Sequence, residues 1–285
     1  MIITSFTLIV LLFINWGLES FKWKLLISRS ENISFGKAFQ AVLGGLAVSI
    51  FTPNRVGEFM GRVFILQKTD PLKAILLTIV GSFSQLLVTI VFGSVAYVFF
   101  AQRYLASFIP KSEWLVNGVS FTLITISGLV FFLYFNISAL HRISFAFPAK
   151  YSERFTNGIN TITGCSRRLL FKVLMISASR YVVFSVQFYL ALLLTGVQVT
   201  PIQVLQVIPV IYLILTSIPT VALTEIGVRG SVAVFVLGLL AGNSGFDAGS
   251  SLAVVSATTL IWLVNIAVPS LAGVVVVFRL KFFRR

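Results

Sequence analysis

The chain has 285 residues, of which 58% are hydrophobic and only 11% are charged, and its mean hydropathy is +1.01. Soluble domains carry about a quarter charged residues, so this composition excludes a water-soluble enzyme or binding domain. The formal net charge of +14 would suit nucleic acid in a soluble protein. Here the basic residues cluster at the ends of apolar segments, so we expect anionic membrane lipid as the partner and no nucleic acid.

Long apolar segments recur along the whole chain. In chain order they are Ile2–Leu18, Lys37–Thr52, Leu72–Phe100, Trp114–Phe135, Leu169–Thr195, Ile202–Ile218, Ser231–Ala241 and Ser250–Phe278. In lipid such segments must be helices, because β-barrel spans would be shorter and would alternate in polarity. Crossing a bilayer core takes about 20 helical residues. The shorter segments therefore predict two re-entrant hairpins, broken at Pro53 with Gly57 and at Pro219 with Gly227. The fold class is all-α, a polytopic integral membrane protein with about five full spans plus the two hairpins.

The two halves of the chain repeat one order of elements. Residues 1–100 read as span, hairpin and long span, and residues 169–278 read the same. A connector span at 114–136 and a basic loop at 137–168 lie between them. This order predicts an inverted-topology repeat within a single transmembrane domain. In transporters built this way, broken helices in the two halves surround a site near the bilayer midplane.

Basic residues mark one side of the membrane. They gather after the first span, after the first hairpin, between His141 and Lys172, and at the C-terminus. The positive-inside rule places these regions in the cytoplasm. We therefore expect a multi-pass protein of the cytoplasmic (inner) membrane, with the N-terminus outside and the C-terminus in the cytoplasm. Apolar residues at helical spacing from Phe147 to Ile162 predict an amphipathic helix on the membrane surface.

Ionisable residues within the hairpins and spans form the candidate substrate-binding site. They are Arg55, Glu58, Arg62, Arg180, Glu225 and Arg229. Each hairpin holds a Glu-x-x-x-Arg pair, which could simply neutralise itself on one helix face. Matching pairs in both halves favour a binding role instead, since each charge at the bilayer centre costs about 2.5–3.5 kcal/mol on insertion scales. Four arginines against two glutamates leave a charge of +2, which suits a phosphate-bearing ligand.

Several of these residues lie in stretches that resemble a known family. The stretch from Thr52 to Glu58, followed by Arg62, resembles the first signature of the membrane domain of the lysylphosphatidylglycerol synthase family, a flippase-like domain. The segments Asn15-Trp16 with Lys22-Trp23-Lys24, Arg180-Tyr181, and Pro219 to Arg229 are similar to that family in the same order. The resemblance implies a polytopic protein that moves lipids or lipid-linked groups between leaflets.

The chain departs from the family pattern in two respects. Many relatives carry a glutamate directly after the Gly-x-Arg of the second motif, where this chain has Gly230. This puts in question whether Glu225 takes that role. The aminoacyl-transfer domain of the full-length synthases has no counterpart in these residues, so lysine transfer is not carried over.

Together, the residues and the resemblance predict a transporter and not an enzyme. Its substrate would be an anionic phospholipid or a polyprenyl-phosphate-type lipid, with arginines holding the phosphate and Glu58 and Glu225 orienting them or exchanging protons. One histidine, His141, and one cysteine, Cys165, lead us to expect no metal site and no cofactor. No P-loop for ATP is present. A membrane enzyme acting on a lipid phosphate and a scaffold without transport stay open as alternatives, and the sequence is compatible with a homo-oligomer.

Overall fold

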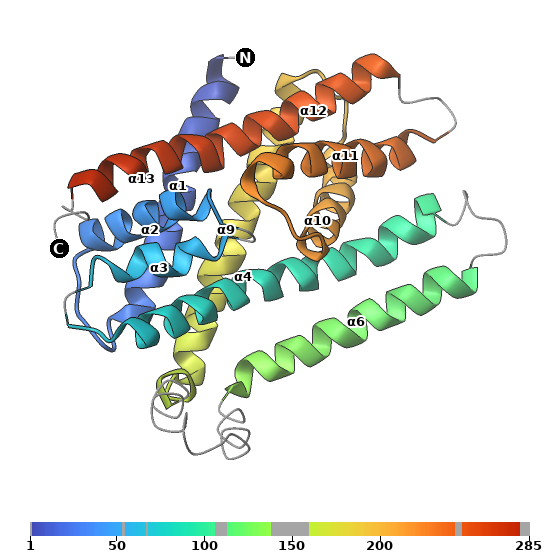
Figure 1. Ribbon diagram of the computed structural model, residues 1–285. Helices are drawn as coiled ribbons and strands as arrows, with labels where there is room; N and C mark the ends of the chain where they lie inside the picture. The colour runs from blue at the N-terminus through green and yellow to red at the C-terminus, as the bar shows by residue number, and fades with distance from the viewer. Residues whose placement is uncertain are drawn as a thin grey trace.

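The computed structural model describes residues 2–52, 55–66, 68–105, 113–137, 160–242 and 247–279, and the regular elements in these ranges are helices (Figure 1). They are α1 (Ile2–Ile27), α2 (Phe35–Ser49), α3 (Gly57–Val63), α4 (Pro71–Phe100), α6 (Glu113–Phe135), α9 (Arg167–Leu194), α10 (Pro201–Ser217), α11 (Ala222–Ala241), α12 (Ala248–Trp262) and α13 (Val268–Arg279). A π-helical turn at Ala101–Leu105 extends α4, and another at Leu263–Ala267 joins α12 to α13. Within the described ranges, six helical stretches are long and apolar enough to cross a bilayer. The prediction of an all-α polytopic membrane protein is confirmed.

Capping residues explain where several helices begin. The Asp70 side chain accepts hydrogen bonds from two backbone N–H groups in the first turn of α4, and Pro71 follows it at the first helical position. Thr200 and Gln203 form a reciprocal capping box at the start of α10. These caps satisfy backbone donors that have no partner inside the helix. Both helices therefore begin one residue ahead of the predicted apolar run, α4 at Pro71 and α10 at Pro201.

Two predicted segments have wrong boundaries. Helix α1 continues to Ile27, nine residues beyond the predicted end at Leu18. Helix α11 starts at Ala222, nine residues before the predicted start at Ser231. The apolar run of α1 ends before charged residues, and that of α11 begins after them. In both cases the helix also includes the charged residues, which lie in the interior of the protein. Since the apolar part of α11 is itself long enough to span, the length argument for a re-entrant arm fails there. It still applies to α2, α3 and α10, so the re-entrant arrangement stays a prediction.

The predicted hairpin breaks are partly found. A short non-helical segment containing Pro219 separates α10 from α11. Helices α2 and α3 are also separate, but Pro53 between them lies outside the described residues. Gly57 is the first residue of α3. Gly227 lies inside α11, with open space where a Cβ would be, so the prediction of a break at Gly227 was wrong.

Glycines allow helices α2 and α3 to pack very closely. A Cβ added to Gly61 in α3 would come within 2.5 Å of Gly45 Cα in α2, and one added to Gly57 would lie 2.7 Å from the Val48 carbonyl oxygen. Helix association in lipid depends on such small residues, because no hydrophobic driving force pulls apolar helices together there. The two helices of the first hairpin therefore form one tight unit (Figure 1).

The long last helix of each half packs against the hairpin of the other half. Helix α4 contacts α10 at Gly93, where an added Cβ would lie 2.6 Å from Leu213 Cβ. Helix α13 contacts α2 at Gly273, where an added Cβ would collide with the Leu43 carbonyl group. Reciprocal packing of this kind is what an inverted repeat would produce. We keep the repeat, with its predicted boundaries, as our interpretation of the domain organisation.

The connector helix α6 runs beside α4 at the edge of the molecule (Figure 1). Most of its apolar side chains are exposed, with Trp114 and Phe121 each at 75%, as expected for a face in contact with lipid. Of the basic loop that follows, residues 138–159 lie outside the described ranges, and with them most of the predicted amphipathic helix from Phe147 to Ile162.

Candidate functional site

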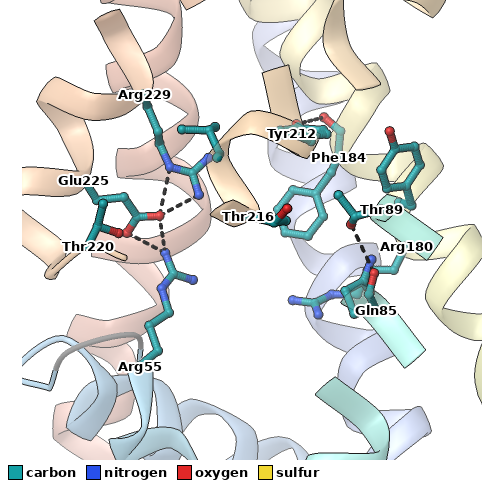
Figure 2. A pocket seen from close by; sticks show the side chains of 12 residues that line it. Arg55, Gln85, Thr89, Arg180, Phe184, Tyr212, Thr216, Thr220, Glu225 and Arg229 are labelled. Atoms are coloured by element: carbon teal, nitrogen blue, oxygen red, sulfur yellow. Dashed lines mark hydrogen bonds and ion pairs between the residues drawn. The ribbon is translucent and has the colours of Figure 1, made fainter. Parts of the chain in front are cut away.

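Glu225 links helix α11 to the segment between α2 and α3. It lies in the first turn of α11, and its Oε1 accepts hydrogen bonds from Arg229 Nε at 2.9 Å and Nη2 at 2.6 Å. Arg55, which comes from the first hairpin, donates from Nη2 to both Glu225 oxygens at 2.9 and 2.7 Å (Figure 2). Two guanidinium groups on one carboxylate leave a local charge of +1. The structure thus brings together three of the predicted site residues from opposite halves of the chain.

The backbone of Arg55 is strained. Its φ of 59° lies in the left-handed region, and among the described residues it is the one non-glycine residue with a positive φ. Such a conformation costs on the order of 1–3 kcal/mol and persists only where surrounding contacts hold it. Here the Glu225 ion pair holds the side chain, and the Thr52 carbonyl accepts a hydrogen bond from the Arg55 backbone N–H at 3.3 Å. Residues strained in this way cluster at functional sites.

A second network centres on Glu19 of α1. Its carboxylate lies 2.7 Å from Lys22 Nζ, 2.8 Å from Arg62 Nη2 and 2.6 Å from Arg180 Nη1. Arg62 also contacts Glu58, its partner one turn earlier in α3. Glu19 is 4% exposed and Lys22 is 1% exposed. Charges buried this deeply are retained only when they are paired and hydrogen-bonded, and this cluster connects α1, α3 and α9.

Glu19 and Lys22 were not among the predicted site residues, because both follow the predicted end of the first span at Leu18. A signal was present in their spacing. Asn15, Glu19 and Lys22 follow one another at intervals of four and three residues, which places them on one face of a continuous helix. Polar residues that recur on one face of a membrane helix indicate that this face is buried against other parts of the protein.

Arg180 is held from several directions. It is the fourteenth of the 28 residues of α9, halfway along the helix. Its Nε donates to Asn15 Oδ1 at 2.7 Å, and Asn15 in turn donates to Asn265 Oδ1 at 2.8 Å. The guanidinium carbon lies 5.2 Å from the centre of the Trp16 ring and 5.1 Å from that of Phe184. Such cation–π contacts stabilise a desolvated guanidinium, so Arg180 is positioned before any ligand arrives.

Two cavities open onto these networks. The Arg229 chamber, of about 340 Å³, is lined by Arg55, Arg180, Glu225, Arg229 and the aromatic residues Tyr181, Phe184 and Tyr212, among others (Figure 2). The Glu19 chamber, of about 440 Å³, is lined by Glu19, Lys22, Arg55, Glu58 and Arg180, among others. Arg55 and Arg180 line both chambers, as do Gln85 and Thr89. The chambers are therefore neighbours that share a wall containing two arginines.

The charges of the two networks do not cancel. The cations are Lys22, Arg55, Arg62, Arg180 and Arg229, and the carboxylates are Glu19, Glu58 and Glu225. Five against three leaves a surplus of two positive charges. This equals the surplus predicted from the six sequence candidates, because the two residues that were missed carry opposite charges.

Arg62 differs from the other predicted arginines. It is 2% exposed and is not among the residues that line the two chambers. Its guanidinium instead joins Glu19 to Glu58. The expectation that Arg62 holds a phosphate directly does not fit this position, and we assign it as a positioning residue. Arg55, Arg180 and Arg229 do reach the cavities.

Gly230 stands where α11 approaches α12. It is buried, and an added Cβ would lie 3.3 Å from a Val255 methyl group. A longer side chain there would meet α12, whereas Glu225, five residues earlier, lines the Arg229 chamber. The described residues contain no group of three or more His, Cys, Asp or Glu side chains placed to hold a metal ion.

Comparison with known proteins places these features in a family. A family model described as the lysylphosphatidylglycerol synthase TM region matches residues 2–275, a range that includes both networks and both chambers. No match was found among curated proteins or among solved structures. Since the family model covers nearly the whole chain, this protein belongs to the family of the lysylphosphatidylglycerol synthase transmembrane region.

Proposed function

We propose that this protein is a membrane transporter that moves an anionic phospholipid or a lipid-linked phosphate between the two leaflets. The observation that carries the proposal is the lining of the Arg229 chamber by Arg55, Arg180 and Arg229. A guanidinium group has five N–H donors in a planar fork. In each of these arginines only part of the fork is directed at a carboxylate. The remaining donors suit the oxygens of a phosphate group, which guanidinium binds in bidentate fashion.

The balance of charge supports a ligand over a purely structural role. Ion pairs that only held helices together could be neutral, and a surplus of two cations in a low-dielectric interior is costly. A bound phosphate would remove part or all of that surplus. A scaffold without transport would need neither the surplus nor a chamber beside it.

The shared wall between the chambers suggests how a headgroup could cross. Arg55 and Arg180 line both cavities. A phosphate that moved from one chamber to the other could therefore stay in contact with a guanidinium group throughout. Without such contact a bare charge at bilayer depth would face a barrier of several kcal/mol. Because no P-loop is present, we expect a gradient, a partner or simple downhill flow as the driving force.

A membrane enzyme acting on a lipid phosphate remains the second candidate. Such an enzyme would need a free general base, an activated nucleophile or a metal ion. Glu58 and Glu225 are both ion-paired to arginines, so neither is a free carboxylate. Release of phosphate from lipid phosphates by the purified protein would support the enzyme and count against the transporter.

The transport proposal is tested in proteoliposomes that contain phosphatidylglycerol, by oxidising the outer-leaflet headgroups with membrane-impermeant periodate. Wild-type protein should speed movement of lipid from the inner leaflet. Arg229→Gln should lower the rate about tenfold or more, since a hydrogen bond to a charged group contributes about 1.5–3 kcal/mol. The control is Arg103→Gln, an exposed arginine in the turn after α4, which should transport normally. Wild-type protein that is no faster than empty liposomes, or Arg229→Gln that transports normally, would contradict the proposal.

A further inference from the structure

An apolar groove of about 590 Å³ lies between α4, α9 and α10. Its walls include Phe92 and Phe99 from α4, Val182 and Val186 from α9, and Leu205 from α10. Several of these side chains are open to the surroundings, with Val182 at 53% and Leu205 at 72% exposed. The volume falls within the range of about 300–1,000 Å³ that is typical of ligand sites.

One aromatic wall separates this groove from the Arg229 chamber. Tyr181 lines both cavities. Its ring stacks on Phe92, with ring centres 5.1 Å apart, and meets Tyr212 edge-on at 5.8 Å. Phe92 belongs to the groove and Tyr212 to the chamber. The groove and the chamber are therefore divided by the thickness of a single side chain.

The groove and the chamber also lie at the same level along α9. Arg180 and Phe184 line the chamber, whereas Val182 and Val186 line the groove, so the same two turns of helix present one face to each. Along α4 the groove runs on from Phe92 to Phe99. That is about 10 Å at 1.5 Å per residue, so the groove leads away from the arginines along the helices.

We propose that the groove holds one acyl chain of the same anionic phospholipid whose phosphate lies in the Arg229 chamber, with the glycerol unit passing beside Tyr181. This inference rests on the transport function proposed above and specifies its substrate as a lipid bound at both ends. The cationic Arg229 chamber and the apolar groove lie on two sides of the Tyr181 ring. They match the charged headgroup and the apolar acyl chain of a phospholipid. A soluble phosphate would leave the groove unused, and a zwitterionic lipid such as phosphatidylcholine would bring a cation of its own to a chamber lined by Arg55, Arg180 and Arg229.

The groove contributes alignment more than affinity. Bilayer chains are about as apolar as protein side chains, so moving a chain from the bilayer into the groove gains little hydrophobic free energy. What the groove can do is hold the chain in line while the headgroup enters the chamber. Blocking it should therefore slow translocation while leaving the arginines in place.

Photo-crosslinking tests the occupant directly. The probe is phosphatidylglycerol with a diazirine on its acyl chain, in liposomes of phosphatidylcholine, compared with a phosphatidylcholine probe that has the same chain. The phosphatidylglycerol probe should label peptides of the groove several-fold more than the control probe, and Arg229→Gln should abolish this excess. Both probes should label the surroundings of Val275, on α13, equally. Equal labelling of the groove by both probes, or an excess that survives Arg229→Gln, would show ordinary bilayer lipid there and overturn the proposal.

A pair of valines provides the matched variants, because Val182 in the groove and Val275 on α13 are both 53% exposed. Val182→Trp should remove the labelling excess and slow translocation at least fivefold, and Val275→Trp should do neither. If Arg229→Gln stops translocation while Val182→Trp behaves like Val275→Trp, transport stands and the groove assignment fails. If wild-type protein moves no lipid but the labelling excess depends on Arg229, the two-ended lipid site stands and transport fails. Should Val182→Trp not fold, the comparison of the two probes in wild-type protein decides.

Discussion

Replacing Glu19 should destabilise this protein more than replacing either of the other two network carboxylates. The Glu19 oxygens lie within 2.8 Å of Lys22, Arg62 and Arg180, whose side chains are at most 11% exposed. Glu19→Gln keeps the size of the side chain but removes its charge. The three cations would then face one another, with Glu58, the partner of Arg62, as the remaining carboxylate of the cluster. Because α1, α3 and α9 meet at this cluster, repulsion there should loosen the contacts among all three helices.

The size of the effect follows from burial. Removing one partner from a buried ion pair typically costs about 3–5 kcal/mol, because the remaining charge is left uncompensated. For Glu225→Gln we expect about 1–2 kcal/mol, because its partners Arg55 and Arg229 are 33% and 23% exposed and solvent screens them. With roughly 2–4 °C per kcal/mol, Glu19→Gln should lower the melting temperature by roughly 6–20 °C. The decrease for Glu225→Gln should be a few degrees.

The assay is thermal unfolding of the purified protein in detergent at one fixed scan rate, because membrane proteins often unfold irreversibly. A second substitution checks the cause. Lys22→Met in the Glu19→Gln background removes one uncompensated cation and should restore part of the lost melting temperature, although Lys22→Met alone should destabilise. If Glu19→Gln melts like wild type, or if the losses of the double variant simply add, the buried charges of this cluster are not coupled as described.

Two further predictions concern packing and orientation. Gly61→Leu should prevent folding, because an added Cβ would lie 2.5 Å from Gly45 Cα; Gly118→Leu, in open space on α6, should elute from size exclusion like wild type. For orientation, burial raises the pKa of the Cys165 thiol, so that cysteine should react slowly with maleimide, and Cys165→Ser removes the remaining background. In that variant Arg284→Cys should react with an impermeant maleimide only after the membrane is opened; reaction in intact cells would place the C-terminus outside.

Composition and the length of apolar runs sufficed to predict the polytopic helical fold, because lipid imposes helices on any chain that crosses it. Helix boundaries were harder to predict. In α1 the predicted apolar run ends before Glu19, and in α11 the predicted run begins only after Glu225. Both helices nevertheless include these charged residues. A hydropathy average over neighbouring residues counts each charged residue as unpaired. The fold compensates them with partners far along the chain, such as Arg180 for Glu19 and Arg55 for Glu225.

The candidate site shows the same division between local and distant information. Both Glu-x-x-x-Arg pairs form as predicted, since residues four apart on a helix meet without help from the rest of the fold. The link between Arg55 and Glu225 joins residues 170 positions apart, and only the inverted order of elements hinted at it. Which side of a buried ion network opens to a cavity depends on packing among all the helices. For that reason the sequence could not separate Arg62, which is enclosed, from Arg55, Arg180 and Arg229, which line chambers.

The charge selectivity of translocation tests the transport site most directly. Wild-type protein and Arg229→Gln are reconstituted side by side, and the rates for phosphatidylglycerol and phosphatidylcholine are compared in the same liposomes. Both lipids carry a phosphate, but phosphatidylcholine also carries a choline cation. If the surplus positive charge selects a headgroup of net negative charge, wild-type protein should move phosphatidylglycerol about tenfold faster or more, and the variant should bring the ratio of rates towards one. Equal rates for the two lipids with wild-type protein, or a ratio unchanged by Arg229→Gln, would contradict a transport site that selects anionic lipid through its surplus positive charge.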